Sequence, residues 1–196
     1  MGAIALGVSV GKAGTQDTVS RSFPGVREIV VEADGGSVTL RAATGPDARV
    51  DTTRFWTPGY EPVVTSGVSG GVLTLTSDCP DFNIGCETTH AITVPAGTDV
   101  RVHTIGGAIE AVGLDSPRFS ADAVGGPVTA SFTAPPEDVR VQTVAGPVRV
   151  TVPQAGYRVT AETVVGAVHI GVAQDPASAR TISAHTVTGP VDVLPG

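Results

Sequence analysis

Apolar and polar residues alternate along most of the second half of the chain. The alternation is clearest in five segments, in which nearly every second residue is apolar or threonine. Successive side chains of a β-strand point to opposite faces, so this period of two predicts strands with one buried face. The segments are VRVHT (100–104), FSADA (119–123), VRVQT (139–143), VTAET (159–163) and ISAHT (182–186).

A glycine motif follows each of these segments at a regular interval. A glycine is followed by Ala or Pro and then by Val or Ile, and successive glycines are 19, 20, 20 and 23 residues apart. Glycine supplies the backbone freedom for a sharp bend, and Pro, which cannot donate a backbone hydrogen bond, fits at a corner. The five glycines are Gly107, Gly126, Gly146, Gly166 and Gly189.

A repeat of about 20 residues predicts a stack of coils. A single coil cannot bury its apolar face alone, whereas stacked coils share a continuous core. We therefore expect an all-β fold, specifically a single-stranded right-handed parallel β-solenoid. The longest interval predicts a small outward loop near residues 174–179. An antiparallel β-sandwich is the alternative, although it does not require position-matched columns.

Composition agrees with a β-fold and narrows the function. The 196 residues include 25 Gly and 15 Pro but one Met, which argues against a mainly helical chain. A formal net charge of −7 argues against a nucleic-acid partner, because binding to nucleic acid needs a basic surface. The chain has no GxGxxG, P-loop or HExxH motif, and we predict neither a cofactor nor a metal site.

The N-terminal segment differs from the rest of the chain. Residues 1–11 are apolar or small but too few to span a membrane, and residues 12–22 are polar. We interpret residues 1–22 as the end of a signal or membrane segment followed by a linker, and residues 23–196 as the β-solenoid domain. Cys79 and Cys86 lie in a Gly- and Pro-flanked loop, which predicts a disulfide and an oxidising compartment.

The Gly-x-Val repeats, the segment VPAGTDVRVHT (94–104) and the central cysteine pair resemble one bacterial family. This is the putative-adhesin family of β-strand-repeat domains, and the resemblance covers residues 23–194. It implies a parallel β-solenoid outside the cytoplasm, which in actinobacteria often follows an N-terminal membrane segment. The full membrane segment is missing here, so membrane contact would come only through a missing anchor. No catalytic residues carry over, because the family has none established.

Outward polar residues share one column of the repeat. Stacked coils lie about 4.8 Å apart, so these side chains form a ladder that is either an ordinary solvated face or a binding surface. The binding candidates in this column are His103, Asp122, Gln142, Glu162 and His185. Trp56 is a separate candidate, which either plugs an end of the stack or lies in a binding patch. A second outward column holds Glu110, Thr129, Arg149, His169 and Asp192.

Two short motifs suggest chemistry, and each has a simpler interpretation. Residues 67–71 match the GxSxG motif of nucleophilic serines, but a strand follows instead of a helix, which favours a glycine turn. Cys79, Cys86 and His90 are metal-ligand types, but structural zinc takes four ligands, so a disulfide beside a surface histidine fits better. We predict no catalytic residues.

Three functions fit these observations. The first is a non-catalytic, adhesin-like domain, at the cell surface or membrane-anchored, that presents the polar ladder to a cell-wall glycan or an envelope protein. The second is a scaffold resembling bactofilin polymers, a homo-oligomer stacked end to end through the strand at 191–194, which has no polar cap. The third is a polysaccharide-active enzyme, which the lack of carboxylates on adjacent coils disfavours.

Overall fold

The computed structural model describes residues 5–11, 14–79 and 85–196, and these residues form eighteen β-strands and no helix. The all-β prediction is confirmed. Within these ranges, no helix is long and apolar enough to cross a membrane.

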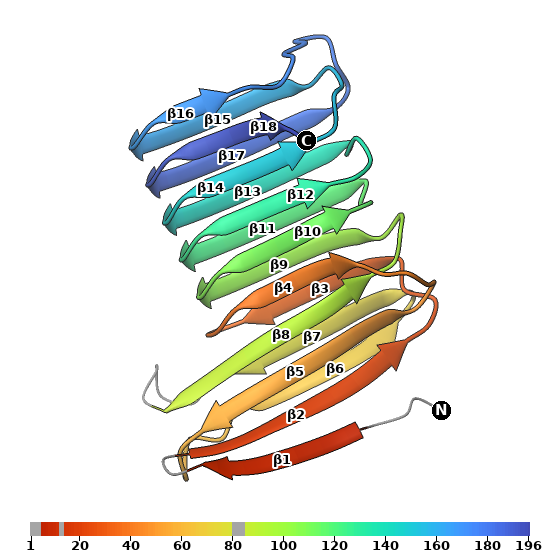
Figure 1. Cartoon of the computed structure of the whole chain (residues 1–196), viewed down its shortest axis with the longest axis vertical. Helices are drawn as coiled ribbons and strands as arrows, with labels where there is room; N and C mark the ends of the chain where they lie inside the picture. Colours follow the sequence, from red (N-terminus) through yellow and green to blue (C-terminus); the bar gives the residue numbers. More distant parts are fainter. Residues whose placement is uncertain (1–4, 12–13, 80–84) are drawn as a thin grey trace.

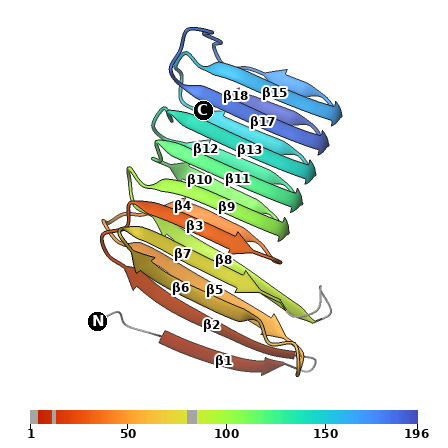
Figure 2. The same ribbon diagram turned by 180° about the vertical axis from the view of Figure 1, so that it is seen from behind.

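The strands form two sheets that face each other across one apolar core (Figures 1 and 2). The first sheet has ten strands, in the order β1 (Ala5–Gly11), β2 (Gly14–Phe23), β5 (Ala48–Trp56), β8 (Cys86–Val94), β4 (Val38–Ala42), β10 (Ile109–Leu114), β12 (Val128–Phe132), β14 (Val148–Val152), β18 (Val191–Pro195) and β16 (Val168–Ile170). The second sheet has eight strands, in the order β15 (Arg158–Val165), β17 (Thr181–Thr188), β13 (Asp138–Ala145), β11 (Arg118–Gly125), β9 (Asp99–Gly106), β3 (Glu28–Ala33), β7 (Val72–Asp78) and β6 (Val63–Ser69).

In the C-terminal half, the chain passes from the second sheet to the first within every repeat. Neighbouring repeats pair in parallel, so that Phe119 of β11 lies beside Val100 of β9 and Val139 of β13. On the first sheet, Val128 lies beside Ile109 in the same way. All five side chains are at most 1% exposed. The register that the sequence columns predict is therefore confirmed for these repeats.

The glycine column makes the turn between the two sheets. Gly126 has a φ of 118°, and a Cβ atom there would lie 2.2 Å from the carbonyl oxygen of Gly107 in the neighbouring repeat. Glycine is therefore required by both the backbone angle and the close approach. The next residue, Pro127, contributes its carbonyl oxygen to the N–H of Ile109 at 3.0 Å and needs no N–H of its own.

The predicted single-stranded solenoid is not confirmed. Its coils would stack in sequence order, but β17 and β18 lie between the β13–β14 and β15–β16 repeats, and β3 and β4 lie between β7–β8 and β9–β10. The sheets are also mixed, because β1, β2, β5 and β6 pair with their neighbours in antiparallel. A purely antiparallel sandwich does not describe the fold either, since the repeats pair in parallel.

The long interval before the last repeat explains its displaced position. Residues 171–180 connect β16 to β17 and give the chain the length to return into the stack. Ile182 and Ala184 of β17 are almost fully buried, whereas Val159 of β15 is only partly buried. The open end predicted at residues 191–194 is therefore wrong, because β15 and β16 are the terminal strands.

Residues 14–22, which belong to the expected linker, lie in β2 (Gly14–Phe23) within the first sheet. This strand pairs with β5 through nine residue pairs, from Thr15 to Phe23. Its Asp17 is buried and accepts a hydrogen bond from Arg54 Nε at 2.8 Å. Because its polar side chains bond to those of β5, the strand lacks the apolar alternation that would predict it.

Candidate functional site

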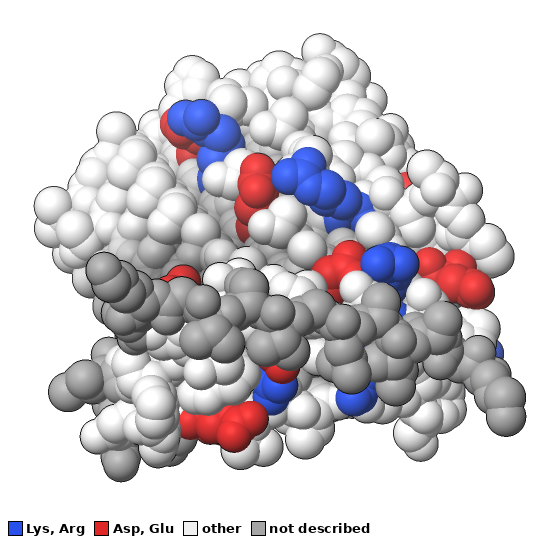
Figure 3. Space-filling model, turned by 60° about the horizontal axis from the view of Figure 1, so that its bottom comes forward, with Lys and Arg blue, Asp and Glu red and all other residues white. Residues whose placement is uncertain are grey.

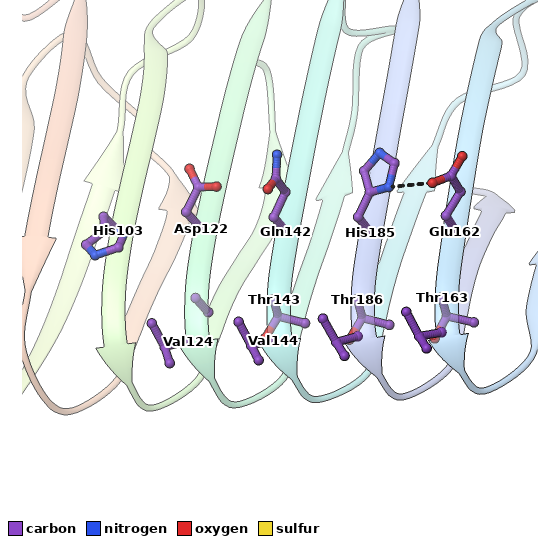
Figure 4. Close-up of a pocket in the computed structure, with 13 residues that line it drawn as sticks. His103, Asp122, Val124, Gln142, Thr143, Val144, Glu162, Thr163, His185 and Thr186 are labelled. Atoms are coloured by element: carbon purple, nitrogen blue, oxygen red, sulfur yellow. Dashed lines mark ion pairs between the residues drawn. The ribbon is translucent and has the colours of Figure 1, made fainter.

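The five predicted ladder residues do lie side by side on the outer face of the second sheet. Strand pairing places Asp122 between His103 and Gln142, and His185 between Gln142 and Glu162. The order along the stack is therefore His103, Asp122, Gln142, His185, Glu162, with the last two exchanged relative to the sequence. We call these five residues the polar ladder (Figure 4).

The same column continues toward the N-terminal strands, where sequence reasoning missed it. Glu32 of β3 pairs with His103, and Thr76 of β7 pairs with Glu32. The sequence does contain a signal for this continuation, because residues 30–40 (VVEADGGSVTL) have the alternation and the glycine turn of the later repeats. Its place in the stack could not be read, because β3 comes before a long excursion of the chain and lies beside β9 only in the folded structure.

An exposed apolar row runs beside the polar ladder, two residues further along each strand. Its side chains are between 38% and 77% exposed, which is unusual for residues of this type. The row consists of Ile105, Val124, Val144, Val187 and Val164. We call it the valine row.

Together, the polar ladder and the four valines of the valine row line a groove of about 420 Å³. The groove runs across neighbouring parallel strands, and residues of β9, β11, β13, β17 and β15 contribute to it. Figure 4 shows the ladder side chains along one side of the groove and the valine and threonine side chains along the other. An occupant would therefore be extended along the stack, with polar contacts on one flank and methyl contacts on the other.

Hydrogen bonds hold parts of the groove in place. His185 Nε2 lies 2.7 Å from Ser183 Oγ, and its Nδ1 lies 3.6 Å from Glu162 Oε2 (Figure 4). Behind the ladder, Thr143 Oγ1 donates to the carbonyl oxygen of Gly126 at 3.3 Å, and Thr186 Oγ1 donates to that of Gly146 at 3.0 Å. These hydroxyl bonds run along the stack and have turn glycines of neighbouring repeats as their acceptors.

The outer face of the first sheet has a different character. Its polar column runs Glu110, Thr129, Arg149, Asp192, His169, again with the last two exchanged. Opposite charges pair there, with Arg149 Nη2 2.9 Å from Asp192 Oδ2. Figure 3 shows positive and negative side chains next to one another on the surface it presents. Such paired charges are typical of a solvated face and leave little unsatisfied chemistry for a ligand.

Trp56, the remaining binding candidate, lies far from the groove. It ends β5 in the first sheet and pairs with Thr15 and Cys86 near the opposite end of the molecule. The guanidinium carbon of Arg54 lies 5.2 Å from its ring centroid, within cation–π range. The structure therefore does not bring Trp56 together with the polar ladder.

The predicted disulfide between Cys79 and Cys86 is confirmed. His90 is not a surface residue as expected, because it is fully buried on the inner face of β8. Its Nδ1 lies 3.0 Å from Thr52 Oγ1 and its Nε2 lies 3.0 Å from Ser77 Oγ across the core. Burial lowers the pKa of His90 to about 4, so the imidazole is neutral at physiological pH.

The GxSxG motif forms part of a hairpin and not a nucleophile elbow. Ser69 ends β6, and Gly70 and Gly71 adopt positive φ angles of 59° and 84° in the two-residue turn to β7. This conformation matches the turn that paired glycines favour between antiparallel strands. The glycine-turn interpretation is confirmed.

No protein-family model matches the chain, and no curated protein matches it. Nine chains of solved structures do. A putative cell adhesion protein from Clostridium sporogenes is 11% identical over 100% of both chains, with a TM-score of 0.66. A putative adhesin from Bacteroides fragilis is 12% identical over 90% of this chain and 97% of that one, with a TM-score of 0.37. A putative lipid binding protein from Parabacteroides distasonis is 11% identical over 90% and 96%, with a TM-score of 0.31.

The Clostridium protein shares the fold of this chain, whereas the other two TM-scores are too low to show a shared fold. At 11% identity, the likeness bears on the fold that the resemblance to adhesin-like proteins implies and not on their role. The actinobacterial part of that resemblance finds no support in a Clostridium structure.

Proposed function

We propose that this protein is a non-catalytic interaction domain that acts outside the cytoplasm and binds an extended cell-wall glycan along the groove of the second sheet. The observation that carries the proposal is the groove itself, which five neighbouring strands build from one polar and one apolar row. A binding surface formed by repetition suits a ligand that is itself a repeating chain.

The chemistry of the two rows matches a sugar chain. The polar row offers the carboxylates of Asp122 and Glu162, which accept hydrogen bonds from hydroxyl groups. The side-chain amide of Gln142 can both accept a hydrogen bond from a hydroxyl group and donate one to it. Val124 and Val144 offer methyl groups to the C–H face of a sugar ring. The spacing of the rungs, about 4.8 Å, is close to the length of one sugar unit in an extended chain.

Two further observations support a place outside the cytoplasm. The Cys79–Cys86 disulfide persists most readily in an oxidising compartment. The protein from Clostridium sporogenes with the same fold is described as a putative cell adhesion protein, which agrees with a role at the cell surface.

The spacing of the carboxylates favours binding over cleavage. Along the ladder, Asp122 and Glu162 are separated by Gln142 and His185, which amounts to three strand spacings, or about 14 Å. Glycoside hydrolases place their two carboxyl groups about 5 to 9.5 Å apart. The two acids of the groove are therefore too far apart to act as a pair on one glycosidic bond.

The test is co-sedimentation of the purified, oxidised protein with isolated cell walls and, separately, with lipid vesicles. We expect saturable binding to walls and none to vesicles. Replacing Gln142 and Asp122 by Ala should weaken wall binding by about fivefold per lost hydrogen bond. The matched control is the replacement of Thr129 and Arg149 by Ala on the first sheet, which should leave binding unchanged.

A result in which both double variants bind equally well would overturn the assignment to the groove. Binding to walls that survives enzymatic removal of the glycan would indicate an envelope protein as the partner instead. Release of soluble sugar from the walls by the wild type, lost in the Asp122 variant, would contradict the non-catalytic assignment.

A further inference from the structure

The two sheets end differently at the N-terminal end of the stack. Counting outward from the β3–β4 repeat, the second sheet continues with β7 and β6, whereas the first continues with β8, β5, β2 and β1. Among the described residues, no strand of the second sheet therefore lies opposite β2 and β1. We call these two strands the N-terminal ledge; they are the lowest strands in Figures 1 and 2.

The inner side of β2 is only partly covered. A cavity of about 110 Å³ lies between β2, β5 and β6, and valine side chains alternate with polar ones around it. Its lining residues are Val19, Arg21, Val50, Thr52, Arg54, Val64 and Ser66. Further out on the ledge, the register pairs Leu6 of β1 with Val19, and Val8 with Asp17.

The charges at the ledge already have partners within the chain. Arg54 Nε donates to Asp17 Oδ1 at 2.8 Å, and its Nη1 lies 3.7 Å from Glu61 Oε1. Arg21 Nη1 donates to Ser66 Oγ at 2.9 Å and so links the ledge to β6. A partner of this surface therefore needs apolar groups and strand edges, not a compensating charge.

The strand β6 is an edge without the usual protection. It pairs only with β7 among the described strands, and its sequence, VVTSGVS, contains neither a charged residue nor Pro. Val63 is 60% exposed and Val68 is 41% exposed. Edge strands of soluble proteins usually carry charges, Pro or bulges that block pairing with another chain. The lack of these features leaves the edge of β6 open to pairing with another strand.

At the opposite end of the stack, the edge of β15 is protected in part. Both sheets end there at the same level, with β15 and β16. Residues 173–175 form a short bridge to Tyr157, which covers the start of the β15 edge. Arg158 and Glu162 add charges along the same strand. End-to-end pairing through β15 is therefore disfavoured.

We propose that two copies of this chain form a dimer in which their N-terminal ledges interlock, and this proposal is independent of the groove. A two-fold axis parallel to the strands brings the first sheet of one copy into line with the second sheet of the other. The ledge of each copy then fills the two-strand gap of its partner. The free edge of β1 meets β6 of the other copy, and the two ledges pack face to face.

The strand directions and the strand counts both fit this arrangement. A two-fold axis along the strands preserves their directions, and β1 and β6 run in opposite directions in Figure 1, so the new pairing is antiparallel. A head-to-tail contact between the level end and the stepped end would leave a gap of two strands in the second sheet. The interface is therefore isologous and closes as a dimer, without forming a filament.

The size of the interface suits a weak but specific dimer. Each ledge is two strands wide, with seven residues in β1 and ten in β2, which gives a face of about 270 Å² per copy. Two new strand pairings add to this area, and the sum stays below about 1,200 Å², in the range of weak interfaces. We expect a dissociation constant in the micromolar range.

Sedimentation velocity of the full, oxidised chain from low micromolar to millimolar concentration tests the dimer. The expected result is a species of twice 19.7 kDa at high concentration. The variant Val68→Lys places a charge on the edge of β6 and should weaken association at least tenfold. The matched control, Val168→Lys, makes the same change at a similarly exposed valine of β16 and should leave the dimer intact.

Hydrogen exchange provides a second measurement that needs no variant. Raising the protein concentration should slow exchange in β6 and leave β15 unaffected. A monomer at every concentration would overturn the proposal, as would a polymer that grows without limit. Loss of association in Val168→Lys but not in Val68→Lys would assign the contact to the other end of the stack and would also overturn it.

Discussion

Acidification should destabilise this protein through His90. The imidazole is fully buried, and burial lowers its pKa from 6.5 to about 4. As the pH falls below 6.5, the unfolded chain binds a proton at this residue while the folded protein does not. The contribution of the neutral imidazole to the free energy of unfolding is therefore complete above pH 6.5 and is lost progressively as the pH falls toward 4.

The magnitude follows from the difference between the two pKa values. Each unit corresponds to about 1.4 kcal/mol, so the complete loss is about 3 kcal/mol. At pH 5, about 2 kcal/mol of this is already lost, because the unfolded state is almost fully protonated and the folded state is still neutral. Against a typical stability of about 5 to 15 kcal/mol, this is a large change.

Urea unfolding at pH 7 and pH 5 measures the effect. The variant His90→Gln removes the titrating group and keeps an amide that can bond to Thr52 or Ser77. It should be less stable than the wild type at pH 7, but its stability should fall by about 2 kcal/mol less on going to pH 5. Other titrating groups contribute equally to both proteins and cancel in the comparison.

Two results would refute this reasoning. One is the same loss of stability between pH 7 and pH 5 in the wild type and in His90→Gln. The other is an NMR titration in which the His90 ring protonates near pH 6.5 in the folded protein, because the ring would then be accessible to solvent.

Three further predictions concern the stability of the stack. Replacing Gly126 by Ala places a Cβ atom against the neighbouring turn at a residue with a positive φ. This change should lower the free energy of unfolding in urea by about 3 kcal/mol or more. The control Gly45→Ala, whose Cβ meets no atom within 4 Å, should be nearly neutral. Reducing the Cys79–Cys86 disulfide should lower the free energy of unfolding by about 2 kcal/mol, because the unfolded loop regains freedom; an unchanged midpoint in dithiothreitol would contradict this. Phe119→Ala should cost about 4 kcal/mol, since this ring is 1% exposed and packs edge-on against another core phenylalanine; a loss below 1 kcal/mol would show that the core is loosely packed there.

The register of the repeats could be predicted from the sequence because the columns are chemically distinct. Gly126 has a neighbour that only a glycine tolerates, and Phe119 and Val139 can be buried only on the inner face. A shift by one residue would expose every core side chain, so the alternation specifies the pairing strongly. The five ladder residues share a face for the same reason.

The order of the repeats could not be predicted, because repeats with the same columns can stack on one another in more than one order. Ala161 and Ala184 occupy the same column, so nothing in either strand decides which one lies next to Val141. The choice depends on the connection at residues 171–180. It changes the site, because it places His185 and not Glu162 beside Gln142.

The buried polar residues of the N-terminal half could not be predicted from the sequence either. His90 is buried because Thr52 and Ser77 reach it from two other strands, one of them across the core. Asp17 is buried because Arg54 lies beside it in the next strand. Both partnerships join residues far apart in the chain, and an isolated polar residue gives no sign of such a partner.

The most direct test of the central claim is an NMR titration of the protein with soluble fragments of cell-wall glycan. If the groove is the binding site, the methyl signals of Val124, Val144 and Val187 and the side-chain amide of Gln142 should shift together and saturate at one dissociation constant. Signals from the outer face of the first sheet, such as those of Thr129, should stay unchanged. Shifts confined to the first sheet, or no shift at any fragment concentration, would contradict the account.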